Sequence, residues 1–283
     1  MKRWICGLLA LCLLWTGWAV AEEEDLSVEE IVEYEDLDAI PGADPLWDFP
    51  VALEDMDPAL VRLANKHYLL EKGYVTEPLV TVKALKLDKG GNNTNGGVRK
   101  ASSAKMQLQE DCYLALVAMS DAARADGYNL YLKSAYRSWQ TQNTMYKNRL
   151  AKNKGKDDGW VSKPGASDHQ TGLGCDVIPK SWLKASGMNE KMAKEPECVW
   201  MAQHCQEFGF ILRYPADKED ITEINYEPWH LRYVGVPAAE YIMENSLCLE
   251  EFNDQLQAAI QAYLLTGGNR EKVEAFIQTP TEE

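Results

Sequence analysis

Four residues of this chain combine types and spacings that are typical of a hydrolytic metal site. His169 and Asp176 lie seven residues apart in the segment SDHQTGLGCD, and Glu227 and His230 are the first and last residues of EPWH. Two His and one carboxylate leave a tetrahedral zinc ion with one open position for water. A neighbouring Glu that is not a ligand is well placed to act as general base. The pattern therefore predicts metal-assisted hydrolysis.

The backbone has to bring these residues together. On a straight strand, His169 and Asp176 would lie about 23 Å apart, so both reach one ion only if the chain turns between them. Gly172 and Gly174 permit that turn. Pro228 biases the residue before it towards extended backbone, so the EPWH element is predicted to be a loop that runs into a strand.

The surrounding elements predict an α+β fold, because helices and short strands follow one another without a regular βαβ alternation. Hydrophobic periodicity predicts helices over 107–125, 139–152 and 197–208, and strands over 128–135, 176–178, 210–213 and 229–234. After Pro237 the pattern is mostly helical, with a break at the glycines 267–268.

The first 21 residues have the pattern of a secretory signal peptide. Lys2 and Arg3 precede an almost wholly apolar run, and the segment AVA fits the rule for cleavage after Ala21. The run is short for a spanning helix, and an uncleaved N-terminal anchor is the alternative. Both place the rest of the chain outside the cytoplasm, and we expect no membrane span in the mature protein.

The negative charge of the chain is concentrated in one stretch. The 283 residues carry a formal net charge of −15, and residues 22–58 contain 15 Asp or Glu but no Lys or Arg. Self-repulsion and several prolines predict an acidic linker here, whereas the rest of the chain is close to neutral. Because general nucleic-acid binding needs clustered Lys and Arg, the composition excludes that class.

Five cysteines follow the predicted signal peptide, so at least one thiol must stay unpaired within a monomer. No CxxC pair is present, and most of these cysteines are predicted to be buried as small apolar side chains. The two remaining histidines, His67 and His204, are expected to be ordinary surface or packing residues. Two SxxK segments, at 102–105 and 181–184, lack the KTG or SDN partner of a serine peptidase.

The combined motif SxHxxGxxxD and ExWH closely resembles the zinc D-Ala-D-Ala peptidases, in particular the VanY-type D-alanyl-D-alanine carboxypeptidases. The resemblance covers about residues 60–250 and includes further segments: SAYRS at 134–138 with Gln142, KPGAS at 163–167, FGF at 208–210, RYP at 213–215 and EPWHLRYVG at 227–235.

The resemblance implies a fold shared with the Hedgehog signalling domain, in which helices flank a small, mostly antiparallel sheet. It also implies residue roles. His169, Asp176 and His230 would bind Zn²⁺, and Glu227 would take a proton from the zinc-bound water and pass it to the leaving amine. Arg137 would face the terminal carboxylate of the substrate or the developing oxyanion, and Ser138, Gln142 and Ser167 would line the pocket.

The chain departs from the family pattern at two positions. Gly174 replaces the usual Ala, a small-for-small change that we expect to have no effect, and Glu223 replaces a common Gly before EPWH. The expected organisation is a signal peptide over 1–21, an acidic linker over 22–58, a zinc peptidase domain over 59–250 and a helical extension over 251–283. We expect the protein to be a monomer.

The leading functional hypothesis is a D,D-carboxypeptidase that removes the terminal D-Ala of peptidoglycan stem peptides. Alternatives are an L,D-carboxypeptidase that trims tetrapeptide stems, a lysin-like endopeptidase, and a catalytically silent cell-wall-binding or signalling module. The intact Glu227 argues against the silent module, because pure binding needs no general base.

Overall fold

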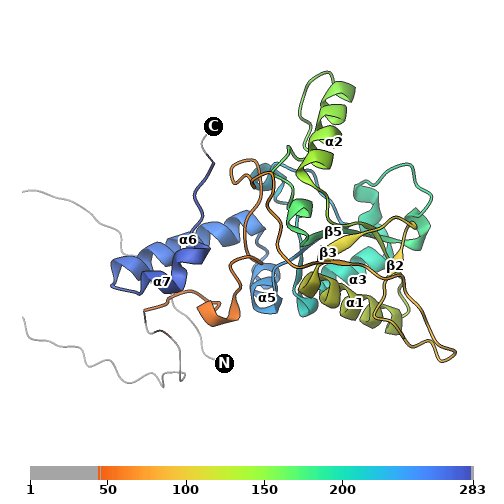
Figure 1. Cartoon of the computed structure of the whole chain (residues 1–283), viewed down its shortest axis with the longest axis horizontal. Helices are drawn as coiled ribbons and strands as arrows, with labels where there is room; N and C mark the ends of the chain where they lie inside the picture. Colours follow the sequence, from red (N-terminus) through yellow and green to blue (C-terminus); the bar gives the residue numbers. More distant parts are fainter. Residues whose placement is uncertain (1–43, 45, 282–283) are drawn as a thin grey trace, which may run out of the picture. The chain divides into compact units, whose positions relative to one another are not determined.

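The structure, a computed structural model, describes residues 44 and 46–281 and contains a five-stranded mixed sheet (Figure 1). The strands follow the order β2 (Arg99–Lys100), β4 (Leu130–Ser134), β5 (Gly174–Pro179), β7 (His230–Tyr233) and β6 (Phe210–Leu212). β2 and β4 are parallel, and the other neighbouring strands are antiparallel. The predicted α+β fold with a small, mostly antiparallel sheet is confirmed.

Two helices build the main core against this sheet, α1 (Glu110–Ala125) and α3 (Pro196–His204). Their apolar side chains, such as Leu116 and Met201, share one buried cluster with strand residues such as Leu132 and Val177. All six residues of β5 are buried, as expected for a strand with partners on both edges.

The helix predicted over 107–125 begins later than the sequence pattern indicates. Residues Gln107–Gln109 form strand β3, which pairs with β1 (Leu79–Thr81) in a separate antiparallel ladder. The Gln109 side chain then accepts a hydrogen bond from the backbone N–H of Cys112 and caps α1. The pairing of Leu108 with Val80 thus outweighs the helical periodicity of these three residues.

The other predicted helices lie close to their expected positions. α2 (Trp139–Lys152) matches the prediction, and α3 continues as a 3₁₀ turn that ends at Gly209. Gly209 has a φ of 78°, in the left-handed region that favours glycine. A short helix, α4 (Glu219–Thr222), leads into the EPWH segment.

A second core joins the C-terminal helices to the segment before residue 59. It contains α5 (Val236–Glu244), α6 (Leu249–Leu265) and α7 (Arg270–Val273), coloured blue in Figure 1, and residues 46–58, coloured orange. Phe49, for example, makes edge contacts with the rings of Tyr241 and Phe252. The helical prediction for the C-terminal region and its break at the glycines 267–268 are confirmed.

The folded body therefore extends beyond both predicted domain boundaries. Val51 and Met56 are buried, although the acidity of 22–58 predicted a linker there. The apolar residues of this segment pack against the amphipathic faces of α5 and α6, which outweighs the charge repulsion. The predicted boundary at residue 250 falls inside α6.

The predicted signal peptide over 1–21, and the linker up to residue 43, lie outside the described residues. Among the residues that the structure describes, no helix is both long enough and apolar enough to cross a membrane.

Candidate active site

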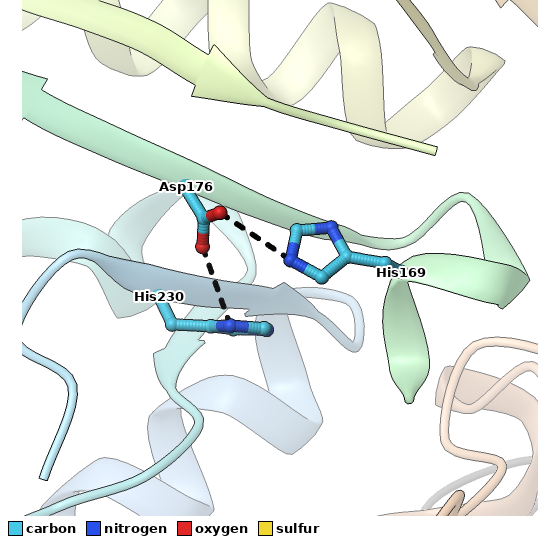
Figure 2. A group of neighbouring side chains, drawn as sticks. All are labelled: His169, Asp176 and His230. Carbon is cyan, nitrogen blue, oxygen red and sulfur yellow. Dashed lines mark ion pairs between the residues drawn. The ribbon is translucent and has the colours of Figure 1, made fainter. Parts of the chain in front are cut away.

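Three side chains from three different elements converge at the site, as Figure 2 shows. His169 lies on the 3₁₀ turn Asp168–Thr171, Asp176 lies on β5, and His230 begins β7. Nε2 of His169 lies 3.5 Å from Oδ2 of Asp176, and Nδ1 of His230 lies 3.4 Å from Oδ1. All three residues are buried, and their potential ligand atoms lie within 4.8 Å of one another.

The predicted turn between His169 and Asp176 is centred on Gly172. Its φ of 79° lies in the left-handed region, and its N–H donates to the His169 carbonyl. A Cβ here would lie 2.6 Å from Cδ2 of Leu79, so both conformation and space favour glycine. Gly174 does not supply the turn, because it already belongs to β5.

Hydrogen bonds to the far side of each imidazole fix which nitrogen faces the centre. Nδ1 of His169 donates to the carbonyl of Ala135 at 2.8 Å, which leaves Nε2 towards Asp176. Nε2 of His230 lies 3.0 Å from Oδ1 of Asp168, which leaves Nδ1 towards Asp176. Such partners orient metal-binding histidines and raise their basicity.

Burial and neighbouring charges shift the pKa values of all three side chains. Burial lowers the pKa of His169, with a further contribution from the positive charge of Arg137. Burial alone would raise the pKa of Asp176, but the charge and hydrogen bond of His169 outweigh it and lower the pKa to about 2. Burial alone would lower the pKa of His230, but the carboxylate of Asp168 outweighs burial and raises the pKa of His230.

Glu227 lies beside the group formed by His169, Asp176 and His230 but is not a member of that group. Its Oε2 is 3.2 Å from Nδ1 of His230, and its backbone N–H donates to the Tyr214 carbonyl. Burial raises the pKa of Glu227, although His230 partly opposes the shift. A carboxyl group with a raised pKa next to a possible metal-binding set is a candidate for proton transfer.

A pocket of about 140 Å³ opens onto these residues and also contains Arg137, Gln142 and Ser167. The Nε atom of Arg137 is buried without a hydrogen-bond partner. Gln142 donates from Nε2 to the Ser162 carbonyl, whereas its Oε1 is buried and unpaired. The remaining wall is largely apolar or aromatic and includes Met145, Trp160, Val161, Met188, Tyr214, Ile224 and Trp229.

Of the predicted site residues, only Ser138 does not line this pocket. Its hydroxyl accepts a hydrogen bond from the Thr141 N–H and caps α2, the helix that carries Gln142. The structure therefore places Ser138 at the start of the helix and not in the pocket wall.

Comparison with known proteins identifies the family. The sequence profile of VanY, described as D-alanyl-D-alanine carboxypeptidase, matches residues 105–236. YodJ, a candidate carboxypeptidase of Bacillus subtilis (strain 168), is 40% identical over 202 residues, which are 70% of this chain and 68% of YodJ. The chain belongs to the VanY family. The predicted family is thereby confirmed, and the protein is an enzyme of the D-alanyl-D-alanine carboxypeptidase class.

Two solved structures resemble this member of the VanY family. The LdcB LD-carboxypeptidase is 35% identical, with a TM-score of 0.59 and coverage of 70% of this chain and 87% of LdcB. A mutant of the vancomycin-resistance D,D-pentapeptidase VanY from the VanB-type cassette, in complex with Zn(II), is 29% identical. Its TM-score is 0.50, and the match covers 69% of this chain and 98% of the other.

The first departure from the VanY-family pattern matters, contrary to expectation. A Cβ on Gly174 would lie 2.9 Å from Oδ1 and 3.1 Å from the backbone carbonyl carbon of Asp168. Asp168 is fully buried, so its carboxylate has little freedom to move away. The absent methyl group therefore makes room for this carboxylate.

The second departure places a non-glycine residue in a left-handed conformation. Glu223 ends α4 with a φ of 55°, which explains why a VanY-family chain commonly has Gly there. Its carboxylate lies 2.8 Å from Nε2 of His67 and 3.0 Å from Nζ of Lys66. These contacts tie the loop before Glu227 to the segment 66–67.

Sequence reasoning missed a buried group of four charged side chains behind the possible metal-binding set: Asp168, Arg213, Arg232 and Glu250. The acidic residue adjoining His169 inside the motif, and Arg213 in the segment RYP, were the available signals. Within the described range, the predictions for the two remaining histidines and for the cysteines are confirmed. His67 and His204 make surface pairs with Glu223 and Glu207, and the five cysteines are buried and free.

Proposed function

We propose that this protein is a zinc-dependent D,D-carboxypeptidase that removes the C-terminal D-Ala from peptidoglycan stem peptides. The observation that carries the proposal is one pocket with three contrasting parts: a buried His169–Asp176–His230 set, a separate carboxyl group on Glu227, and a guanidinium with an unpaired Nε on Arg137.

The residues present fit a zinc ion. Two imidazole nitrogens and one carboxylate oxygen form the three-ligand set that leaves a catalytic zinc an open position. Oδ1 of Asp176 is buried and has no hydrogen-bond partner, which a bound cation would satisfy. Zinc held by His169, Asp176 and His230 would supply a Lewis acid that activates water and polarises the scissile carbonyl.

Glu227 is positioned to move the proton. Water adds to the carbonyl carbon of the peptide bond, and Glu227 accepts the proton that the water loses. The C–N bond then breaks, and Glu227 passes this proton to the nitrogen of the departing D-Ala. Burial raises the pKa of Glu227, so the same carboxyl group is able to serve both as base and as acid.

Arg137 is suited to bind the substrate's terminal carboxylate. A guanidinium matches the planar carboxylate with two parallel hydrogen bonds. The backbone N–H of Arg137 donates to the His169 carbonyl, which places the backbone that carries this side chain next to a proposed metal ligand. The pocket of about 140 Å³ is smaller than the ~300–1,000 Å³ of sites for drug-sized ligands, which supports recognition of one small terminal residue.

The predicted signal peptide supports action outside the cytoplasm, where peptidoglycan lies. The substrate is distinguished by incubating the purified zinc-loaded protein with pentapeptide and tetrapeptide stems and recording masses over time. Loss of one D-Ala from the pentapeptide alone is the expected result. Cleavage of the tetrapeptide alone would favour the L,D alternative, and no cleavage of either would contradict the proposal.

A further inference from the structure

Asp168 is a fully buried carboxylate that binds the back of a proposed metal ligand. Its Oδ1 lies 3.0 Å from Nε2 of His230, on the opposite side of the ring from Asp176. Asp168 is not a member of the metal-binding set itself. Any effect of Asp168 on the metal is therefore indirect and depends on its contact with His230.

The second oxygen of Asp168 faces two fully buried guanidinium groups. Nε of Arg213 lies 3.7 Å from Oδ2, and Nη1 of Arg232 lies 3.8 Å from it. None of these three atoms has a hydrogen-bond partner. The contacts are longer than hydrogen bonds, so the two arginines provide positive charge around the carboxylate without locking it by directional bonds.

Other partners hold the two arginines in place. Arg213 donates to both carboxylate oxygens of Glu250 at 2.7 and 2.8 Å. Arg232 donates from Nη2 to the carbonyls of Leu60 and Arg62. Glu250 lies on α6, so this helix is connected to His230 through Arg213 and Asp168, although α6 lies outside the family match over 105–236.

Gly174 completes the enclosure around Asp168. A Cβ at this position would come within 2.9 Å of the oxygen that binds His230. The carboxylate is thus confined by a close backbone on one side and by two fixed positive groups on the other.

We propose that Asp168 is a positioning residue that holds His230 with Nδ1 towards the metal, and that Arg213 and Glu250 of α6 keep Asp168 in place. This inference rests on the zinc site of the proposed function. A carboxylate behind a metal-binding His fixes its ring orientation, and losing such a partner typically weakens metal binding by about 10–100-fold.

The test measures zinc binding rather than peptide cleavage. Zinc affinity is determined by chelator competition for the full chain, for Asp168→Asn and for Gly174→Ala. The second variant changes no charge and no ligand. We expect zinc affinity to fall by about 10–100-fold in Asp168→Asn and to fall in the same direction in Gly174→Ala.

Melting temperatures separate positioning from a purely structural role. Bound zinc raises the melting temperature by an amount that depends on its affinity. A positioning role predicts a smaller zinc-induced rise in both variants, whereas a structural role lowers the melting temperatures with and without zinc equally. A melting temperature that falls equally with and without zinc, or an unchanged zinc affinity in Asp168→Asn, would overturn the inference.

Two substitutions on α6 test the remote end of the connection. Glu250→Gln removes the charge that holds Arg213, and we expect weaker zinc binding. The matched control is Glu251→Gln, because Glu251 pairs with Lys218 and does not contact this group. Equal zinc affinities of the two variants would overturn the part assigned to Glu250. Normal zinc binding by the unmodified chain without peptide cleavage would contradict the proposed function alone.

Discussion

Asp176 and His230 are direct partners across the antiparallel β5–β7 ladder, with Oδ1 of Asp176 3.4 Å from Nδ1 of His230 (Figure 2). Two of the three proposed ligands are therefore placed by strand register, which positions side chains more firmly than a loop does. Glu227, by contrast, lies in the turn that precedes β7 and adds a functional group that the strands do not supply.

The separation of Glu227 from the ligand set predicts different consequences for two substitutions. Glu227→Gln is expected to keep bound zinc and to lose about 10²–10⁴-fold in kcat, because only the proton-transfer group is removed. His230→Ala is expected to lose zinc as well. Zinc content and turnover rate are measured for each purified variant. Near-normal cleavage by Glu227→Gln would contradict the role assigned to Glu227.

Removal of the metal is expected to abolish activity. Prolonged dialysis against a chelator should eliminate peptide cleavage, and added Zn²⁺ should restore it, because the ligand set supplies no serine nucleophile in its place. Penicillin is expected to have no effect for the same reason. Full activity in protein shown to be metal-free would contradict the zinc assignment.

Arg137 is expected to act chiefly in substrate binding. Arg137→Lys keeps a positive charge but loses the planar fork that matches a carboxylate, so we expect a higher KM on a free-acid pentapeptide. A peptide with an amidated C-terminus is the matched control, because it lacks the carboxylate. If Arg137→Lys lowered cleavage of both peptides by the same factor, Arg137 would not recognise the carboxylate.

The sequence predicts the ligands and the general base because each lies in a short motif whose local backbone brings it to the site. It does not predict that Glu250 reaches Arg213, because the two residues are 37 positions apart and meet only in the folded chain. The sequence does not predict that residues 46–58 are folded, and the reason is different. The acidic residues of this segment dominate its composition, whereas Phe49 and Val51 pack in a core that includes the distant C-terminal helices.

The pair between Glu250 and Arg213 predicts a pH-dependent contribution to stability. Burial alone would raise the pKa of Glu250, but Arg213 outweighs it, and the pKa falls below its ordinary value of 4.5. A carboxyl group with a lowered pKa stabilises the fold above its unfolded-state pKa and loses this effect as the pH falls through the folded value.

Glu250→Ala is therefore expected to reduce the free energy of unfolding by about 3–5 kcal/mol at pH 7, because it leaves Arg213 buried without its carboxylate. The difference from the unsubstituted chain should shrink as the pH is lowered below about 4.5. Urea unfolding of both proteins at several pH values measures this difference in the free energy of unfolding. A difference that stayed constant down to the acid transition would exclude this pair as its source.

Glu223 offers a test of how backbone strain and surface pairing balance. Its left-handed φ of 55° costs a non-glycine residue about 1–2 kcal/mol, while partly exposed pairs such as those with Lys66 and His67 contribute up to about 1 kcal/mol each. Glu223→Gly loses the pairs but relieves the strain, so we expect a stability close to that of the original chain.

Glu223→Ala loses the pairs and keeps the strain, so it should be less stable than Glu223→Gly by about 1 kcal/mol. Thermal unfolding of the two variants side by side decides the matter, and an Ala variant as stable as the Gly variant would show that the conformation at this position carries no strain.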